Sequence, residues 1–429
     1  MADAVLNTGL DGARELARQQ KTDEAERAYA ALLDREPEHG EALNYLAMRA
    51  LQRGGSARAR ELLERAARHH PDDLPTWMNL GSVREAQGDF EAACEAFRRA
   101  AARPPGDPAA RLQLGHVLER LGRDGDALLA YFRAITDAQK LGRWLDQETT
   151  APALLERVTH AMRFVKAGRR RAFDQVLEPV MKKHGTAALR RFEECFAIHV
   201  GERRGAPDDP RQRPSILYFP GLAAMPYFDR ASFPWIEALE DQTARIREEL
   251  LAAMPQSAQR ERVFASDAEE RAGLGGSQGA PSWDGFYFFR HGKRRETNHR
   301  LCPYTSAVLD ALPLVQIREH APEVMFSVLA PGTHILPHRG VTNTRVVCHL
   351  PLVVPPDCAL VVGGETHAWE AGRAVVFDDT FEHEAWNRGS STRVVLILDV
   401  WNPGLTPAEQ DAIALLVEAT AGFNRAAAA

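Results

Sequence analysis

The stretch TWMNLGSVREAQGDFEAACEAFRRAAARPP, residues 76–105, decides the architecture of the first third of the chain, because its pattern recurs every 34 residues. Leu80 and Gly81 fall in a first predicted helix, and Ala93 and Phe97 fall in a second. Small residues let two antiparallel helices approach closely, and large residues fill the space between them. The stretch therefore predicts one helical hairpin of a repeating series.

The same pattern appears one period earlier, one period later and once more toward the start of the chain. The matching positions are Leu46, Ala47, Ala59, Leu63, Ala66 and Pro71; Leu114, Gly115, Ala127, Tyr131 and Ala134; and Ala25, Tyr29, Leu32 and Pro37. A proline such as Pro105 ends the second helix of a repeat. About four copies over residues 6–141 predict an α-solenoid, which we assign to residues 1–141.

This array resembles the tetratricopeptide repeat, and the resemblance implies a concave groove that binds a protein or peptide segment. A repeat array that only dimerises the chain or supports the next domain is the alternative. Residues 142–213 continue with helical periodicity and end in a polar, Pro-rich stretch, so we expect a helical cap and a linker. Within this cap we expect Pro179 to kink or end its helix.

Size and charge limit the possible functions. A chain of 429 residues predicts two or three domains, and a formal net charge of -6 gives no general attraction to nucleic acid. The start of the sequence lacks the basic and apolar regions of a signal peptide, and no apolar run approaches the roughly 18 residues that span a bilayer. We therefore expect a cytoplasmic protein without stable membrane association. The five scattered cysteines form no CxxC pair, which predicts reduced thiols.

The second half of the chain changes to short apolar runs bounded by Pro, Gly and Asp. These runs are SILYFPGL, GFYFFRHG, VMFSVLAPG, RVVCHLPLVVPP, CALVVGG, AVVFDD and TRVVLILDVW. Many short strands predict a barrel or sandwich over residues 214–415, followed by an Ala-rich tail at 416–429. Two helical stretches, at 232–253 and 303–311, should pack outside it. Residues 255–283 are long enough for a flap near a site, although a disordered loop explains them equally well.

Two histidines and an arginine stand out in this half. His383 closes a strand-like run, a Gly-Ser turn follows, and Arg393 begins the returning strand. In a hairpin such residues reach the same cavity. Histidine binds metal ions, and a guanidinium holds a carboxylate through two hydrogen bonds. His338 follows an earlier turn, and Gly340 stands two positions beyond it, where an iron oxygenase usually has an acidic ligand.

Three stretches carry a resemblance to one family: residues 327–355, SVLAPGTHILPHRGVTNTRVVCHLPLVVP; residues 369–387, WEAGRAVVFDDTFEHEAWN; and residues 393–407, RVVLILDVWNPGLTP. They resemble the aspartyl/asparaginyl β-hydroxylases, which are 2-oxoglutarate- and Fe(II)-dependent dioxygenases. The resemblance covers roughly 214–410. It implies a double-stranded β-helix, a jelly-roll or cupin-like barrel, behind the α-solenoid. In that family glycine naturally replaces the acid, so the site is expected to be intact with water in the vacated position.

The resemblance also implies roles for single residues. His338 and His383 would bind Fe(II), and Arg393 with Ser327 would hold the distal carboxylate of 2-oxoglutarate. His349 would contact the metal-binding end of that cosubstrate, and Arg345 matches a basic position on the same strand. Asp379 would accept a hydrogen bond from metal-bound water. Val347 departs from the family, in which an enzyme acting on secreted domains has arginine at this position. Binding of the inner carboxylate of 2-oxoglutarate, or the substrate pocket beside it, should therefore differ.

The implied reaction consumes O2 and 2-oxoglutarate and hydroxylates the β-carbon of Asp or Asn in a protein or peptide held by the repeat groove. Three alternatives remain. The barrel could hydroxylate a lipid acyl chain or a small molecule, or it could halogenate a substrate, because an absent carboxylate also admits chloride to iron in other oxygenases. It could also have lost activity and serve as a non-enzymatic scaffold.

Overall fold

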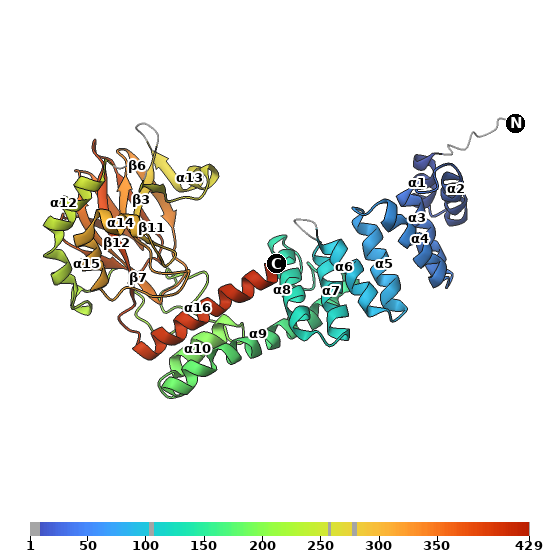
Figure 1. The fold of residues 1–429 in the computed structure, drawn as a ribbon, viewed down its shortest axis with the longest axis horizontal. Helices are drawn as coiled ribbons and strands as arrows, with labels where there is room; N and C mark the ends of the chain where they lie inside the picture. Colours follow the sequence, from blue (N-terminus) through green and yellow to red (C-terminus); the bar gives the residue numbers. More distant parts are fainter. Residues whose placement is uncertain (1–8, 103–106, 256–258, 277–280, 429) are drawn as a thin grey trace. The chain divides into compact units, whose positions relative to one another are not determined.

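The chain forms two compact units in a computed structural model that describes residues 9–102, 107–255, 259–276 and 281–428 (Figure 1). The first unit runs to residue 169 and includes 423–429, and the second spans 170–422. Pro105, the predicted end of a repeat, lies outside the described residues. No helix in the described part of the chain is both long enough and apolar enough to cross a membrane. All five cysteines are buried as free thiols.

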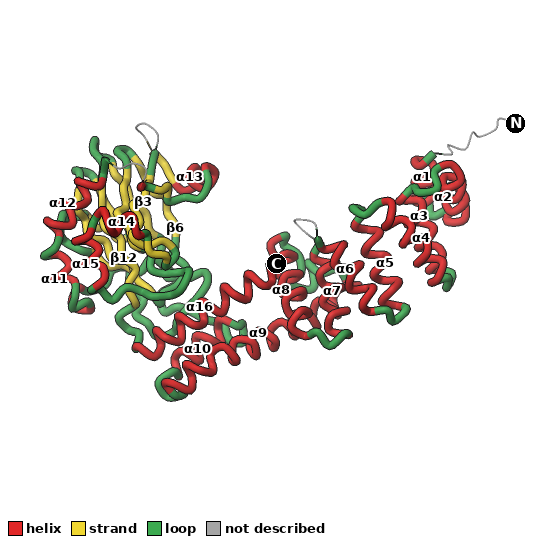
Figure 2. The backbone as a smooth tube through the Cα atoms, in the orientation of Figure 1, coloured by secondary structure: helices red, strands yellow, loops and turns green. Residues whose placement is uncertain are grey.

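The first unit is a series of helical hairpins (Figure 2). Its helices are α1 (Leu10–Arg18), α2 (Thr22–Arg35), α3 (Gly40–Gln52), α4 (Ser56–His69), α5 (Leu74–Ala86), α6 (Phe90–Ala101), α7 (Pro108–Arg120) and α8 (Asp124–Lys140). A Cβ atom on Gly81 would lie 2.6 Å from the Phe97 ring, and the Tyr131 ring crowds Gly115 in the same way. Glycine is therefore required at these two positions, where the helices of their hairpins meet, and the series of hairpins confirms the predicted solenoid.

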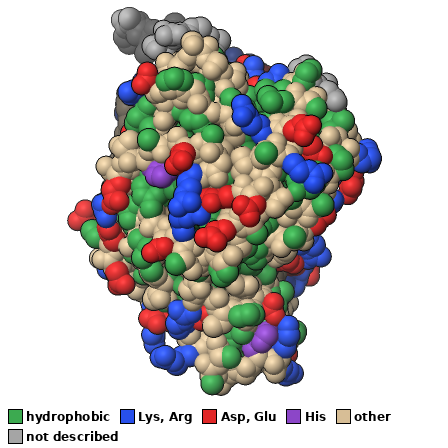
Figure 3. Space-filling view, turned by 90° about the vertical axis from the view of Figure 1, so that its left-hand side faces the viewer, with side chains coloured by type: hydrophobic (Ala, Val, Ile, Leu, Met, Phe, Trp, Pro, Cys, Tyr) green, Lys and Arg blue, Asp and Glu red, His purple; other side chains and the backbone are tan. Residues whose placement is uncertain are grey.

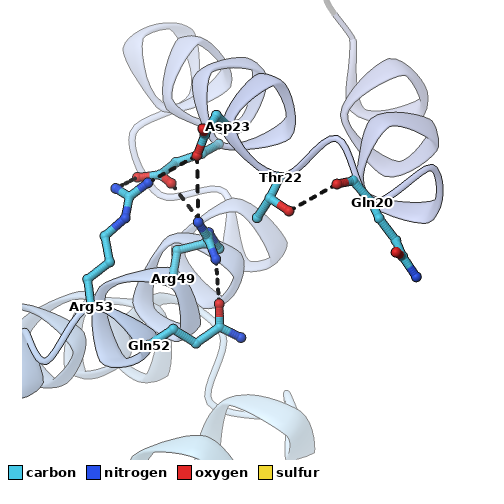
Figure 4. A network of polar contacts seen from close by, with 7 residues as sticks. Gln20, Thr22, Asp23, Arg49, Gln52 and Arg53 are labelled. Atoms are coloured by element: carbon cyan, nitrogen blue, oxygen red, sulfur yellow. Dashed lines mark hydrogen bonds and ion pairs between the residues drawn. The ribbon is translucent and has the colours of Figure 1, made fainter.

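Polar contacts join α2 to α3 near the start of this array, where Asp23, Arg49 and Arg53 form one network (Figure 4). Arg53, directly after α3, reaches Glu26 at 2.7 Å and Asp23 at 3.3 Å, and Arg49 of α3 approaches Asp23 at 3.7 Å. Exposed ion pairs of this kind each contribute at most about 1 kcal/mol. The buried small and aromatic side chains, rather than these charges, therefore hold the hairpins together.

The helices beyond the repeats are η1 (Pro152–Leu154), α9 (Leu155–His184), α10 (Arg190–His199) and α16 (Pro407–Ala428). Of the two expectations for Pro179, that it ends its helix is wrong, since α9 continues through it to His184, and the kink stays a prediction. A proline this close to the end of a helix removes one backbone hydrogen bond and leaves only a short continuation beyond it. The stretch assigned to an Ala-rich tail continues α16. The division at residue 169 falls inside α9, and the domain limits at 141 and 213 stay predictions.

The second unit contains two antiparallel sheets. Its strands are β1 (Glu261–Arg262), β2 (Leu274–Gly276), β3 (Trp283–Arg290), β4 (Lys293–Arg294), β5 (Val324–Leu329), β6 (Thr333–His338), β7 (Arg345–Val353), β8 (Cys358–Val362), β9 (Glu365–Ala368), β10 (Val375–Phe377), β11 (His383–Asn387) and β12 (Arg393–Trp401). One sheet has the order β1-β3-β5-β12-β7-β10, with β4 on β3, and the other has β2-β6-β11-β8-β9. Successive strands from β5 to β8 alternate between the two sheets, β8 and β9 are neighbours in the smaller sheet, and the strands from β9 to β12 alternate again, which is the topology of a jelly roll.

Side-chain alternation gives the larger sheet two different faces. Phe326, Cys348 and Leu396 point outward into a core that includes Ile246 and Leu309, and the neighbouring odd-numbered residues point toward the smaller sheet. The helices of this unit are η2 (Arg230–Ser232), α11 (Ile236–Glu240), α12 (Thr243–Ala253), α13 (Asp267–Gly273), α14 (Glu296–Leu301) and α15 (Pro303–Asp310). Acidic and basic side chains are interspersed on the face that α12 and α15 present (Figure 3).

Three sequence-based expectations need correction. SILYFPGL forms no strand, because Pro220 and the left-handed Gly221 interrupt it and only an isolated bridge at Leu217 remains. Strands β11 and β12 do not form a hairpin: β11 pairs with β6 and β8, and β12 pairs with β5 and β7. The expected flap contains β1, α13 and β2, with 256–258 and 277–280 outside the described residues.

Candidate functional site

Two histidines face each other on neighbouring strands of the smaller sheet. His338 ends β6 and pairs in register with His383, which begins β11, and their ring centroids are 4.1 Å apart. The Nδ1 atom of His338 is 2.9 Å from the Leu336 carbonyl oxygen, and that of His383 is 3.1 Å from the Phe381 carbonyl oxygen. A carbonyl accepts only from an N–H, so both Nδ1 atoms carry the proton and both Nε2 atoms keep a lone pair.

Burial keeps these two imidazoles neutral. It lowers the pKa of His338, and burial together with the neighbouring His338 lowers the pKa of His383 to about 3. A neutral imidazole with a free Nε2 lone pair is the form that binds a metal ion. No cluster of three or more His, Cys, Asp and Glu side chains that could hold a metal occurs among the described residues.

The missing acidic residue has a structural explanation. The Gly340 N–H donates to the Asp379 carbonyl oxygen at 2.6 Å, and a Cβ atom on residue 340 would overlap the Asp379 carboxylate. Residue 340 must therefore be glycine while Asp379 occupies this space. Burial raises the pKa of Asp379 to about 7, although Arg345 opposes the shift, and its Oδ1 atom has no hydrogen-bond partner. An acidic side chain is thus present beside the histidines, supplied by a different loop.

Arg393 is a buried cation without an acidic partner in the described part of the chain. Only 1% of it is exposed, its Nη1 atom donates to Ser327 Oγ at 3.2 Å, and its guanidinium stacks 4.5 Å from the centre of the Trp369 ring. Its Nε atom has no hydrogen-bond partner. Burial lowers the pKa of Arg393 to about 10. Because an isolated buried charge is costly, this pocket is suited to a carboxylate ligand.

His349 lies between the arginine and the histidine pair. It is buried on β7, its Nδ1 atom has no hydrogen-bond partner, and its ring packs edge-on against Phe377 at 5.0 Å. Burial and the charge of Arg393 hold its pKa well below the usual range, so it is neutral. A neutral histidine can offer a hydrogen bond to a ligand that reaches from Arg393 toward His383. Val347, two positions earlier, is apolar and buried in the same wall.

All seven residues predicted from the sequence line one cavity of about 170 Å³ between the two sheets. They are Ser327, His338, Arg345, His349, Asp379, His383 and Arg393. His383 and Arg393 reach it from opposite sheets, which corrects the expected hairpin without separating the residues. Sequence reasoning missed Glu323 and Asp399, which also line the cavity. Asp399 could have been found from the sequence, because it follows Arg393 on β12 by six positions and side chains an even number of positions apart point to the same face of a strand.

Comparison with known proteins places this cavity in a family. The family model described as Aspartyl/Asparaginyl beta-hydroxylase matches residues 240–403, which include all seven residues. The second unit carries an aspartyl/asparaginyl β-hydroxylase domain. The model described as Tetratricopeptide repeat matches residues 10–73, 46–108 and 78–140 of the first unit. The predicted resemblance is thus confirmed for both units.

The hydroxylase domain has several curated relatives. The human aspartyl/asparaginyl beta-hydroxylase is 34% identical over 215 residues, which cover 49% of this chain and 27% of that protein. The human aspartate beta-hydroxylase domain-containing protein 2 is 34% identical over 47% of this chain and 54% of its own length. The ornithine lipid ester-linked acyl 2-hydroxylase of Rhizobium tropici is 32% identical over 45% of this chain and 66% of its own length.

The chain thus spans about a quarter to a half of the two human relatives. These relatives support hydroxylation as the class of reaction that the domain performs. A crystal structure of YrrB, described as a TPR protein with an unusual peptide-binding site, matches 46% of this chain with 16% identity and a TM-score of 0.31.

Proposed function

We propose that the chain is a 2-oxoglutarate- and Fe(II)-dependent dioxygenase that β-hydroxylates Asp or Asn residues of a protein or peptide recruited by its repeats. One observation carries the proposal: a buried arginine without an acidic partner in the described part of the chain shares a cavity with two neutral histidines whose Nε2 lone pairs are free. Such a cavity offers complementary groups to a carboxylate and to a divalent cation at the same time.

The proposed assignment of ligands follows the donors present. His338 and His383 hold Fe(II) through Nε2, and Arg393 with Ser327 Oγ binds the distal carboxylate of 2-oxoglutarate. His349 contacts the inner end of that molecule through its free ring nitrogen. When bound, the metal and cosubstrate supply the oxidation, in which O2 and 2-oxoglutarate give succinate, CO2 and one oxygen atom for the target C–H bond.

The chain itself positions the reactants and limits water. Asp379 presents its free Oδ1 atom as an acceptor for water beside the histidines, and its Oδ2 atom is 3.5 Å from Arg345 Nη2, which fixes the direction of the carboxylate. Phe377 and Leu360 cover the wall around the histidines and keep it apolar. Restricting water in this way strengthens the charge interactions within the cavity.

The test combines purified full-length chain with Fe(II), 2-oxoglutarate, O2 and a panel of Asp- and Asn-containing peptides. We expect succinate and, on at least one peptide, a mass gain of one oxygen atom that His383→Ala abolishes. His334→Gln is the matched control, because His334 lies on β6 like His338 but contacts Glu384 at 2.6 Å; it should retain activity. Absence of both succinate and 2-oxoglutarate binding in the wild type would refute the proposal.

A lipid acyl chain is the second candidate target. The relative from Rhizobium tropici is an ornithine lipid acyl 2-hydroxylase by name, and the cavity wall formed by Val347, Ile397 and Met325 is apolar. The same assay with acylated lipids in detergent distinguishes the two candidates. Oxygen incorporation into an acyl chain and into no peptide would replace the peptide assignment while leaving the cosubstrate site unchanged.

A further inference from the structure

The cavity has two charged ends on one face of the larger sheet. Arg393 and Asp399 both point inward from β12, six residues apart, so alternation along the strand separates their Cα atoms by about 20 Å. At one end, Arg393 has no acidic partner in the described part of the chain. We call the opposite end, lined by Glu323, Arg345, Asp379 and Asp399, the acidic end.

Arg345 is the single cation of the acidic end among the described lining residues, and its guanidinium is already paired with two carboxylates. Its Nη1 atom lies 2.6 Å from Asp399 Oδ1, and its Nη2 atom lies 3.5 Å from Asp379 Oδ2. Both carboxylates are buried, with exposed side-chain fractions of 3% and 9%. Two buried acids thus share one guanidinium, so no positive charge is left over for an incoming anion.

Glu323 adds a third acid to this end. Its Oε1 atom accepts from the His291 backbone N–H at 2.5 Å, and Asp399 Oδ2 accepts from the Glu323 backbone N–H at 2.9 Å, which holds the Asp399 side chain against the Glu323 backbone. Burial and the nearby charge of Asp399 raise the pKa of Glu323 to about 7. The ionised form is therefore disfavoured here even for a carboxylate that belongs to the protein itself.

The wall between the two ends is apolar. Val347 pairs in register with Asp399, and Ile397 pairs in register with His349, so these two aliphatic side chains line the path from the acidic end to the histidines. Among the described lining residues, no Lys or Arg side chain lies in this stretch of wall between Val347 and Ile397. A target group that reaches the histidines through this end passes the hydrogen-bond acceptors of the acidic end and then the aliphatic wall.

We propose that the acidic end selects an uncharged, hydrogen-bond-donating target, so that an asparaginyl amide is hydroxylated in preference to an aspartyl carboxylate. A carboxylate would meet acids whose one cation among the described lining residues, Arg345, is already paired, and like charges placed together cost several kcal/mol in water-poor sites. An amide carries no charge, its NH2 group can donate to the carboxylates, and its oxygen can accept from Arg345. The inference rests on the proposed function and narrows its substrate class.

The test uses two synthetic peptide libraries with identical degenerate flanks, one with Asn and one with Asp fixed at the centre. Product formation is measured with Fe(II) and 2-oxoglutarate, and binding is measured without turnover as the thermal shift of full-length chain loaded with Zn(II) and 2-oxoglutarate. We expect the Asn library to give about tenfold more product or more, and the larger shift. Equal results, or a preference for Asp, would overturn the inference.

Two variants test the cause of the preference. Asp399→Asn frees part of the Arg345 charge, and Glu323→Gln removes an acid while keeping an acceptor for the His291 N–H; either should bring the Asp library closer to the Asn library by about threefold or more. Glu384→Gln is the matched control, because Glu384 also lines the cavity but is paired with His334. An unchanged ratio in both folded variants would contradict the assigned role of the acidic end.

Calorimetry of 2-oxoglutarate binding distinguishes failure of the proposed oxygenase function from failure of the asparaginyl preference. Failure of 2-oxoglutarate to bind the Zn(II)-loaded chain would refute the proposed function itself. Normal binding of 2-oxoglutarate with no shift from either library would leave the oxygenase assignment standing and overturn the asparaginyl preference.

Discussion

Replacing Arg393 by methionine should raise the stability of the ligand-free protein. Burial depresses the pKa of Arg393 from its ordinary 12.5 to about 10, which corresponds to about 3 kcal/mol against the charged form. The variant loses the Ser327 hydrogen bond and the stacking on Trp369, together about 2 kcal/mol. The expected balance is a gain of about 1 kcal/mol in the free energy of unfolding. In exchange, the variant should lose its stabilisation by 2-oxoglutarate.

Urea unfolding followed by tryptophan fluorescence measures both effects, since Trp235, Trp283, Trp369, Trp386 and Trp401, five of the seven tryptophans, lie in the hydroxylase unit. At a hundredfold excess over its dissociation constant, 2-oxoglutarate should stabilise the wild type by about 2.7 kcal/mol and the variant hardly at all.

Arg345→Met is the matched control, because Arg345 lines the same cavity but is paired with Asp399. Its removal leaves buried carboxylates without a cation and should cost about 3 kcal/mol. If Arg393→Met destabilises the protein as much as this control does, and 2-oxoglutarate still stabilises the variant like the wild type, Arg393 is not an unpaired cation that binds the cosubstrate.

Three further predictions concern packing and charge. Gly340→Ala should cost about 1–3 kcal/mol in urea unfolding, because its Cβ overlaps the Asp379 carboxylate, and most of this cost should vanish in an Asp379→Ala background. An equal cost in both backgrounds would exclude that overlap as the cause. Gly81→Ala should destabilise the repeats by a similar amount through the Phe97 ring, whereas a new Cβ on Gly125 meets no atom within 4 Å and should be tolerated. The wild type should lose stability as the pH rises from about 4.5 to about 7, because the raised pKa of Glu323 lets the unfolded chain ionise this group first, and Glu323→Gln should remove this loss. The stability of the variant relative to the wild type should therefore increase by about 1–3 kcal/mol over that range, and parallel pH curves for the two proteins would show that Glu323 is not the group responsible.

The sequence was most informative where a residue type is forced by packing or by a motif. The spacing of Gly81 and Phe97 predicted the hairpins because a bulky ring needs a missing Cβ opposite it. The stretches around His338 and His383 predicted one cavity, and the structure brings them together. In these cases a local pattern carries the constraint directly.

The sequence was less informative where long-range topology decides. The ten positions between His383 and Arg393 suit a hairpin, yet the jelly roll sends β11 and β12 to opposite sheets, and only strand pairing distant in sequence determines this. The role of Gly340 could not be derived either, because Asp379 lies 39 positions away and its carboxylate fills the space only in the folded chain. The acidic end likewise joins Glu323, Arg345 and Asp399 from three strands or strand ends.

X-ray absorption spectroscopy of the Fe(II)-loaded chain, with and without 2-oxoglutarate, reports whether the two histidines bind the metal beside the cosubstrate. We expect a metal sphere with two imidazole nitrogens, provided by His338 and His383, which changes when 2-oxoglutarate is added and is lost in the His338→Ala, His383→Ala double variant. An imidazole signal that survives in that variant, or a spectrum that 2-oxoglutarate leaves unchanged, would contradict the proposed metal site.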